Sequence, residues 1–303
     1  MSPFGSVTSP SETPTIGAAL LSATNRLRVS GSPSARLDAE LLLAHVTGQN
    51  RSYVLAHPDA VLGEVAAFAA ALERRATGEP IAYIRGFKEW RSLRIRTDLR
   101  ALIPRPETEL LADEAMTAIG ARLKRDTARI VAWDVATGSG AVAVALALHF
   151  RSALAAGRLR LIASDVSAEA LELAAENLVA HGVDRNVTLA RADLLEPAGG
   201  RLARPDVIVA NLPYVPSAEV DGRHGSLAFE PRLALDGGPD GLALLRRLLE
   251  TVPDRAAPGA TVLVEVGASQ ANGIGTLAPA GASISVVPDL AGVDRVACIQ
   301  LPD

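Results

Sequence analysis

Short apolar runs rich in β-branched residues alternate with helical apolar patterns from residue 128 to the end of the chain. Seven runs predict strands, at 130–135, 159–164, 187–190, 207–210, 261–266, 284–287 and 296–301. Helices are expected between them, at 141–150, 167–181 and 242–251. This alternation predicts an α/β fold with a doubly wound, seven-stranded, mostly parallel sheet. The last two runs should pair antiparallel, because their connection is too short for a parallel crossover.

The region from residue 15 to residue 80 is predicted to be a small helical bundle. Apolar residues at helical spacing indicate helices at 16–29, from Ser32 to Gly48, and at 61–76, with Ser32 as the N-cap and Pro33 at the first helical position of the second. The bundle carries no catalytic constellation, so we expect it to be a substrate-recognition domain. Residues 1–14, rich in Ser, Pro and Thr, are expected to form a disordered tail.

Residues 81–105 have a different pattern, with aromatic residues close together and apolar residues alternating with arginines at 93–97. This pattern predicts a strand or hairpin that links the bundle to a second domain, 106–303. In the segment Ile103-Pro104-Arg105-Pro106-Glu107-Thr108-Glu109 the prolines fix the backbone, and Glu107 or Thr108 opens a helix to about Lys124. The segment is either a rigid linker before a helix or a lid over a neighbouring pocket.

Composition narrows the possible functions of the 303 residues. The formal net charge of −4 argues against a general nucleic-acid binder, although a local basic patch stays possible. A single cysteine, Cys298, and the lack of a Cys/His cluster predict neither an internal disulfide nor a metal site. No apolar run approaches the ~20 residues of a membrane helix, and the start lacks a secretory signal pattern, so we expect a cytoplasmic protein without membrane attachment.

A glycine-containing turn follows the first strand of the second domain, in the segment Asp134-Val135-Ala136-Thr137-Gly138-Ser139-Gly140. Gly138 and Gly140 allow a tight turn and the close approach of a ligand to the backbone. The turn has neither the GxGxxG spacing nor the lysine of phosphate-binding loops, and Asp134 would repel a pyrophosphate.

Three successive predicted strands end in an acid, namely Asp134, Asp165 and Asp193. Asp165 is suited to accept both hydroxyls of a ribose, and Asp193 to accept the amino group of an adenine, with Leu194 beside the ring. Asp134 would then face a cation. One acid at a strand end is usually a helix cap, but three together with the glycine turn favour S-adenosylmethionine, a nucleoside that carries a cation.

The segment Val207-Ile208-Val209-Ala210-Asn211-Leu212-Pro213-Tyr214-Val215-Pro216 places polar groups at the end of a buried strand. The run ends at Asn211, and Pro213 cannot continue a central strand. In open α/β sheets ligands bind at this end of the strands. The Asn211 side-chain oxygen and the Leu212 carbonyl can accept both hydrogens of a planar –NH2 group, with Tyr214 against its face. The alternative is a turn that only ends the strand.

These segments together resemble the class I S-adenosylmethionine-dependent methyltransferases, which have a Rossmann-like fold. Within them the chain is most similar to the protein-(glutamine-N5) methyltransferases that modify peptide chain release factors. The resemblance covers nearly the whole chain after the tail and includes residues 35–40, 79–83, 102–109, 134–140, 211–214, 229–235 and 289–295. The Arg-Pro-Glu-Thr-Glu and Glu-Pro-Arg segments make it specific.

The resemblance implies methylation of the glutamine side-chain amide nitrogen in the Gly-Gly-Gln motif of class 1 peptide chain release factors. S-adenosylmethionine would be the donor and S-adenosylhomocysteine the product. Separately from the resemblance, we expect a monomer and no direct nucleic-acid contact. The implied catalytic residues are Asn211, Leu212, Pro213 and Tyr214. The implied cofactor site comprises Asp134, Ala136, Thr137, Gly138, Ser139, Gly140, Asp165, Asp193, Leu194 and Asn211. The implied substrate contacts are Arg105, Glu107, Asn211, Leu212, Pro213 and Tyr214.

Two residues depart from the family pattern. Ala136 stands where the family usually has glycine, and it would crowd the cofactor if the position needs a positive φ. Leu212 replaces the first proline of Asn-Pro-Pro-Tyr, but it supplies the same main-chain carbonyl and is biased to an extended conformation before Pro213. We therefore expect weaker cofactor affinity or unchanged activity.

Two other functions stay open. Adenine also presents a planar –NH2 group, so a nucleic-acid adenine amino methyltransferase is the nearest alternative, although the acidic composition counts against it. The second alternative is a non-catalytic binding module on the same fold, which the two departures would favour. A nicotinamide dehydrogenase is disfavoured because the phosphate-binding fingerprint is missing.

Overall fold

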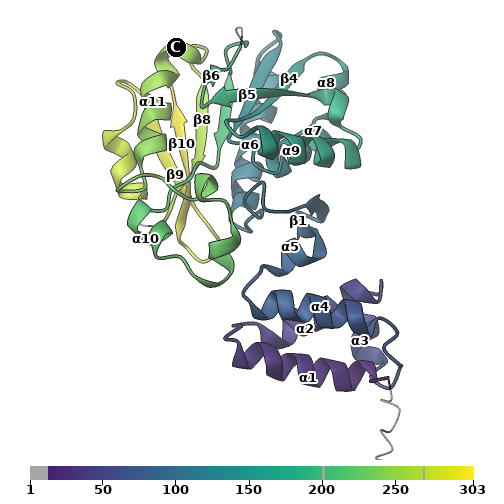
Figure 1. Ribbon diagram of the computed structural model, residues 1–303. Coiled ribbons are helices and arrows are strands. Elements are labelled where there is room, and N and C mark those ends of the chain that lie inside the picture. The colour runs from purple at the N-terminus through teal and green to yellow at the C-terminus, as the bar shows by residue number, and fades with distance from the viewer. Residues whose placement is uncertain (1–12, 200–201, 269) are drawn as a thin grey trace, which may run out of the picture. The chain divides into compact units, whose positions relative to one another are not determined.

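The computed structural model describes residues 13–199, 202–268 and 270–303. They form two compact units, one ending at Arg85 and the other beginning at Gly86 (Figure 1). The domain limits expected at residues 80 and 105 stay predictions. The expected tail, residues 1–14, lies outside the described residues except for its last two. No helix of the described chain is long and apolar enough to cross a membrane.

The first unit is a bundle of helices around an apolar core, as the sequence predicted. The helices are α1 (Ile16–Val29), α2 (Ala35–Val46), α3 (Arg51–Ala56), α4 (Val65–Ala76) and α5 (Ile81–Arg85). Core side chains that are almost fully buried include Leu27, Leu42, Leu43, Val54 and Leu62. The short helices α3 and α5 were not predicted, since so few residues show no helical period.

Two predicted helix starts were wrong, and local hydrogen bonds explain why. Helix α2 begins at Ala35 because the Ser32 and Ser34 hydroxyls donate to Asp38 at 2.6 and 2.9 Å, which keeps both serines and the intervening Pro33 in a turn before the helix. Helix α4 begins at Val65 rather than at residue 61, because Val61 forms a β-bridge with Thr15.

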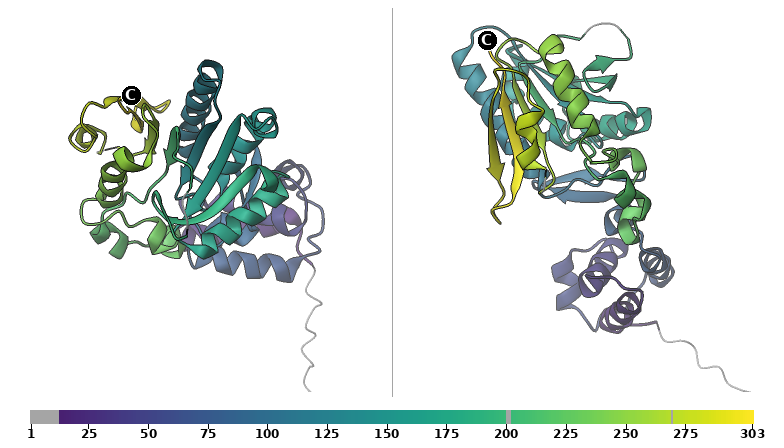
Figure 2. Two further views of the ribbon diagram at one scale, coloured as in Figure 1. Left: turned by 90° about the horizontal axis from the view of Figure 1, so that it is seen from above. Right: turned by 90° about the vertical axis from the view of Figure 1, so that its left-hand side faces the viewer.

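In the described residues, the second unit is built around one large sheet of eight strands in the order β6-β5-β4-β3-β7-β8-β10-β9. The strands are β3 (Ile130–Val135), β4 (Leu159–Asp165), β5 (Val187–Asp193), β6 (Glu196–Pro197), β7 (Val207–Ala210), β8 (Thr261–Glu265), β9 (Ser283–Pro288) and β10 (Asp294–Gln300). Neighbours among β3, β4, β5, β7 and β8 pair parallel. Strand β10 pairs antiparallel with β8 on one side and with β9 on the other, and these three strands lie at one end of the sheet (Figure 2). All seven predicted strands and the predicted antiparallel pair are confirmed, and the two-residue β6 adds an eighth strand at the opposite edge.

Helices cover both faces of this sheet (Figure 1). One face carries α6 (Thr108–Arg125), α7 (Ala141–His149), α8 (Arg151–Ala155) and α9 (Ala168–Ala180), and the other carries α11 (Ala243–Arg255). Along β3 the side chains alternate between two apolar cores: Ala132 lies in the first core, and Trp133 in the second. The doubly wound α/β fold is confirmed. Shorter elements are α10 (Ser217–Asp221) and the 3-10 turns η1 (Asp184–Asn186), η2 (Gly225–Phe229), η3 (Arg232–Ala234) and η4 (Ala271–Thr276).

A separate hairpin of β1 (Phe87–Trp90) and β2 (Leu93–Arg96) precedes α6, and it confirms the strand pattern predicted there. Arg91, in its turn, has φ +48, a left-handed conformation that costs a non-glycine residue about 1 kcal/mol. The backbone N–H of Arg91 donates to Glu109 at 3.1 Å, and its guanidinium lies 2.8 Å from Asp113. The buried Trp90 indole donates to the Arg105 carbonyl at 2.8 Å. The hairpin therefore fixes the segment that leads into α6.

Gly140 is required by packing at the start of α7. Its φ is +77, and an added Cβ would lie 3.0 Å from the Cβ of Ala174 in α9. We expect Gly140→Ala to lower the free energy of unfolding by about 2–4 kcal/mol, measured by urea denaturation. Gly120→Ala is the matched control: it lies inside α6 with nothing within 4 Å of an added Cβ, and should raise stability by up to about 1 kcal/mol. Wild-type stability in Gly140→Ala would contradict this account of the packing.

Candidate active site

A cavity of about 400 Å³ lies at the carboxyl ends of β3, β4, β5 and β7. Most of the predicted site residues line it, namely Arg105, Asp134, Ala136, Thr137, Gly138, Ser139, Asp165, Asp193, Leu194, Asn211, Leu212 and Pro213. Glu107, Gly140 and Tyr214 are not among its lining residues. The cavity therefore gathers side chains from four strand ends and from the segment before α6.

The turn between β3 and α7 encloses the buried carboxylate of Asp134. The Thr137 hydroxyl donates to Asp134 Oδ2 at 2.5 Å. Burial raises the pKa of Asp134 to about 7, and the nearby Asp165 adds to the rise, although hydrogen bonds from Thr137 and the Ala143 N–H oppose it. A cationic ligand beside Asp134 would stabilise its ionised form, so this end of the cavity favours a positively charged group.

Two non-glycine residues that line the cavity have left-handed backbone conformations. Ala136 has φ +56 and Leu194 has φ +53. Each costs about 1 kcal/mol, and such strain clusters at ligand sites. Position 136 thus has the positive φ under which the sequence analysis expected crowding, and its effect on ligand affinity stays a prediction.

The acids that end β4 and β5 differ in their surroundings. Asp165 is nearly buried, and its two oxygens accept from the backbone N–H groups of Gly138 at 2.9 Å and Ser167 at 3.0 Å. This arrangement fixes the carboxylate, while each oxygen keeps a lone pair for a ligand hydroxyl. Burial raises the pKa of Asp165. Asp193 is 52% exposed and forms an ion pair at 2.8 Å with Arg247 of α11, which also lines the cavity.

A chain of hydrogen bonds orients Asn211. Its Nδ2 donates to the Thr108 hydroxyl at 2.9 Å, and that hydroxyl donates to Glu265 Oε2 at 2.7 Å. Glu265 ends β8 and is only 4% exposed. Because the hydroxyl gives its single hydrogen to Glu265, it can only accept from Asn211. The amide orientation is therefore set, and Asn211 Oδ1 is left as the acceptor for a ligand.

Tyr214 lies beside this chain rather than along the cavity wall. Its hydroxyl donates to Glu265 Oε1 at 3.4 Å, and burial, followed by the charge of Glu265, raises its pKa to about 12. The Tyr214 carbonyl accepts from Gln270 Nε2 at 3.0 Å. A Cβ added to Gly237 would lie 2.7 Å from the Pro213 carbonyl, so glycine is needed where the two loops meet.

Several of these residues were missed by the sequence analysis, namely Thr108, Arg247, Glu265 and Gln270. Glu265 follows an apolar run, which is the same signal that singled out the other strand-end acids. Thr108 was considered only as a helix start. The partners of Arg247 and Gln270 lie far away in the sequence, and no local pattern indicates them.

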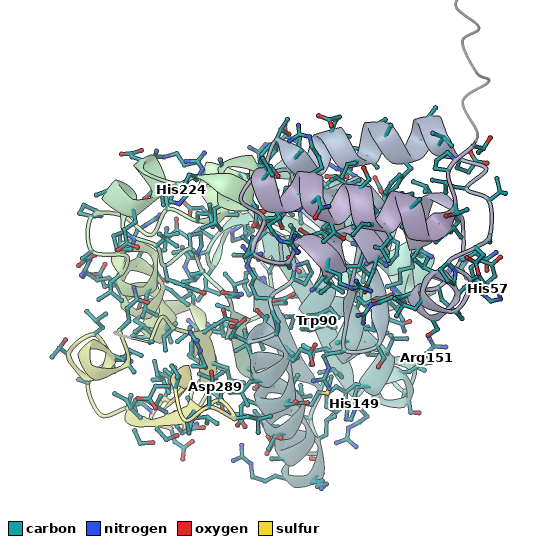
Figure 3. All side chains as sticks on the ribbon, turned by 90° about the horizontal axis from the view of Figure 1, so that it is seen from below. His57, Trp90, His149, Arg151, His224 and Asp289 are labelled. Carbon is teal, nitrogen blue, oxygen red and sulfur yellow. The ribbon has the colours of Figure 1, made fainter. Side chains whose placement is uncertain are left out.

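The described residues contain no group of three or more His, Cys, Asp or Glu side chains arranged to hold a metal ion. His149 and His224, both in the second unit, lie well apart (Figure 3). The cavity lining offers carboxylates, the Asn211 amide and backbone groups.

The raised pKa of Asp134 has a consequence for stability. The folded-state pKa of Asp134, about 7, lies above its ordinary value of 3.8. The stability that Asp134 contributes is therefore fully present below pH 3.8 and is lost as the pH rises through about 7. Asp134→Asn removes this titration. We compare the free energies of unfolding of the ligand-free variant and the ligand-free wild type at each pH. The difference, variant minus wild type, should be larger at pH 8 than at pH 5 by roughly 1–3 kcal/mol. Urea denaturation across this range tests it, and a difference independent of pH would contradict it.

Comparisons with known proteins find relatives over almost the whole chain. A family model described as the PrmC N-terminal domain matches residues 18–86, and one described as N-6 DNA Methylase matches residues 110–234. The release factor glutamine methyltransferase of Moorella thermoacetica is 38% identical over 286 residues, which cover 93% of this chain and 96% of that protein. The protein of the same name from Rhodopirellula baltica is 37% identical, with 91% and 93% covered.

Among solved structures, the hMettl16 catalytic domain in complex with the MAT2A 3'UTR hairpin 6 is similar in fold alone. It has a TM-score of 0.54 and 13% identity, and the match covers 74% of this chain and 83% of that one. The fold is thus that of the class I methyltransferases. With 38% identity over nearly its full length, the chain belongs to the release factor glutamine methyltransferase family.

Proposed function

We propose that this protein transfers the methyl group of S-adenosylmethionine to the side-chain amide nitrogen of the glutamine in the Gly-Gly-Gln motif of class 1 peptide chain release factors. The observation that carries the proposal is the oriented Asn211 amide at the cavity, fixed through Thr108 and Glu265. Relatives named release factor glutamine methyltransferases, alike over almost the whole chain, support the same reaction.

The donor would bind along the ends of β3, β4 and β5. Asp134 would lie toward its cationic methionine end, Asp165 would accept the ribose hydroxyls, and Asp193 with Leu194 would meet the adenine. Ala136, Thr137, Gly138 and Ser139 would supply the backbone of the turn beside it. A buried carboxylate with a raised pKa fits a ligand that carries positive charge. When bound, the donor supplies an electrophilic methyl group and leaves as S-adenosylhomocysteine.

The acceptor amide would bind at the Asn211–Tyr214 segment. An amide nitrogen is a poor nucleophile because its lone pair is delocalised, so most of the catalysis must come from positioning. Asn211 Oδ1 and the Leu212 carbonyl would accept the two amide hydrogens, which draws electron density toward the nitrogen and holds its plane. Pro213 would confine that plane, and Tyr214, which does not line the cavity, would support the segment through its bond to Glu265. The proton would leave to water after transfer, and no strong base is needed.

Residues outside the cavity would help to select the substrate, together with the residues that line the cavity. We propose that Arg105 and Glu107, on the segment before α6, contact the release factor. The helical unit, which matches the PrmC N-terminal domain, would recognise the release factor outside its glutamine. Binding of a folded protein by a separate unit would leave the cavity free for one side chain.

The second candidate is an adenine amino methyltransferase, which the match to the N-6 DNA Methylase model favours. Both reactions present a planar –NH2 group to the same residues. The net charge of −4 and the full-length similarity to release factor enzymes favour the protein acceptor. Salt-sensitive binding of DNA or RNA would favour the nucleic-acid reaction.

Incubation with labelled S-adenosylmethionine tests the proposed reaction. We expect label on a class 1 release factor and none on the same factor with its Gly-Gly-Gln glutamine replaced. Equal labelling of both factors would place the acceptor elsewhere. No label on either, with donor binding intact, would contradict the proposal and direct the search to other amino groups.

Asn211→Ala should lower methyl transfer by more than about 2 kcal/mol of transition-state stabilisation, because it removes a preorganised acceptor.

Thr108→Val should also lower kcat, since it keeps the shape but loses the hydroxyl that orients Asn211. Thr108→Ser keeps the hydroxyl and is the matched control. Single-turnover rates at saturating donor measure the effect. Full activity in Asn211→Ala, or equal rates in the two Thr108 variants, would contradict the assigned roles.

A further inference from the structure

Two segments that line the cavity are joined by the buried carboxylate of Glu230. The first segment, residues 99–105, precedes α6 and is called the strap. Glu230 Oε1 accepts from Arg105 Nη2 at 2.6 Å, and Glu230 Oε2 accepts from the Ile103 N–H at 3.1 Å. The Glu230 side chain is 2% exposed, whereas that of Arg105 is 28% exposed. One carboxylate therefore holds both the backbone and the guanidinium of the strap.

The strap backbone has other supports that do not involve the Arg105 guanidinium. The Arg105 carbonyl accepts from the Trp90 indole at 2.8 Å. Ala101 packs with Ala170 and Leu173 of α9. With the strap held at both ends, the bond between Glu230 Oε1 and Arg105 mainly determines where the guanidinium points.

The second segment follows Glu230 and is linked to the acceptor motif. Pro231, Leu233 and Ala234 line the cavity. The Val215 N–H donates to the Leu235 carbonyl at 3.0 Å, directly after the Asn211–Tyr214 segment. Glu230 thus connects the strap to the loop that supports the proposed acceptor site.

The charges of Glu230 and Arg105 indicate which part of a ligand the Arg105 guanidinium binds. A carboxylate as buried as that of Glu230 is costly to maintain, and a buried ion pair is often no more stabilising than apolar packing. A guanidinium fixed by one N–H keeps further donors for a ligand, in a rigid planar fork. The Arg105 charge acts on Tyr214, where it opposes the rise in pKa that burial and Glu265 cause. Arg105 also lines the cavity three residues before Thr108, whose hydroxyl accepts from Asn211, so it lies toward the acceptor end.

We propose that Glu230 is a positioning residue that directs the Arg105 guanidinium toward main-chain carbonyl oxygens of the acceptor loop beside its glutamine. The inference rests on the proposed function, because it names how that acceptor is held. The donor carboxylate is the other group of suitable chemistry, and the experiment distinguishes the two.

Glu230→Gln separates the two bonds that Glu230 makes. The glutamine oxygen can still accept from the Ile103 N–H, but its –NH2 group then faces the Arg105 guanidinium, a second donor. We expect the Kd for a release factor and its KM to rise about tenfold, with the Kd for S-adenosylmethionine changed less than about twofold. Adding Glu230→Gln to Arg105→Ala should have no further effect, since Glu230 acts through Arg105.

Asp221→Asn is the matched control. It breaks an ion pair with Arg232 near the same loop, but its side chain is 65% exposed and it does not line the cavity. We expect wild-type affinities in this variant.

The Kd values come from binding titrations and need no methyl transfer. An inactive wild-type protein would therefore contradict the proposed function, while the Kd values would still test the inference. An unchanged Kd for the release factor in Glu230→Gln would overturn the inference. A weaker donor affinity with unchanged factor affinity would assign Arg105 to the donor and overturn it too. Additive effects of Glu230→Gln and Arg105→Ala would show that Glu230 acts independently.

Discussion

The hydrogen bond from Asn211 to Thr108 is the interaction on which the site depends. A side-chain amide can face either way, and its donor and acceptor ends have opposite uses at an –NH2 group. Burial raises the pKa of Glu265, but its ionised carboxylate can only accept, so the Thr108 hydroxyl donates to it and in turn accepts from Asn211. A buried acid at the end of β8 thereby determines that an oxygen of Asn211, rather than an –NH2 group, is presented to a ligand.

The rest of the second unit holds this chain in place. The parallel pairing of β3, β7 and β8 brings their carboxyl ends to one edge, and α6 begins with Thr108 at that edge. The hairpin fixes the approach to α6 through Trp90, although its turn is strained at Arg91. Ala136 adds further strain in the turn between β3 and α7. The sheet and its two apolar cores must supply the stability that these local costs consume.

Much of this architecture was predictable because it depends on local patterns. The apolar runs predicted the strands, and the polar residues that follow them predicted the cavity, since parallel strands end at the same edge. Contacts between distant residues were not predictable: Arg247 pairs with Asp193, 54 residues earlier in the chain, and no periodicity indicates this pair. Gly140 has a packing role against α9 that no local sequence pattern indicates.

The central claim is that Asn211 Oδ1 and the Leu212 carbonyl hold the glutamine amide in line with the donor methyl group. A crystal structure with S-adenosylhomocysteine and a Gly-Gly-Gln peptide tests it most directly. The account predicts the glutamine amide nitrogen within hydrogen-bonding distance of both oxygens, with the sulfur over one face of the amide plane and Asn211 Nδ2 still bonded to Thr108. A glutamine bound elsewhere, or an Asn211 amide turned to donate to it, would contradict the account.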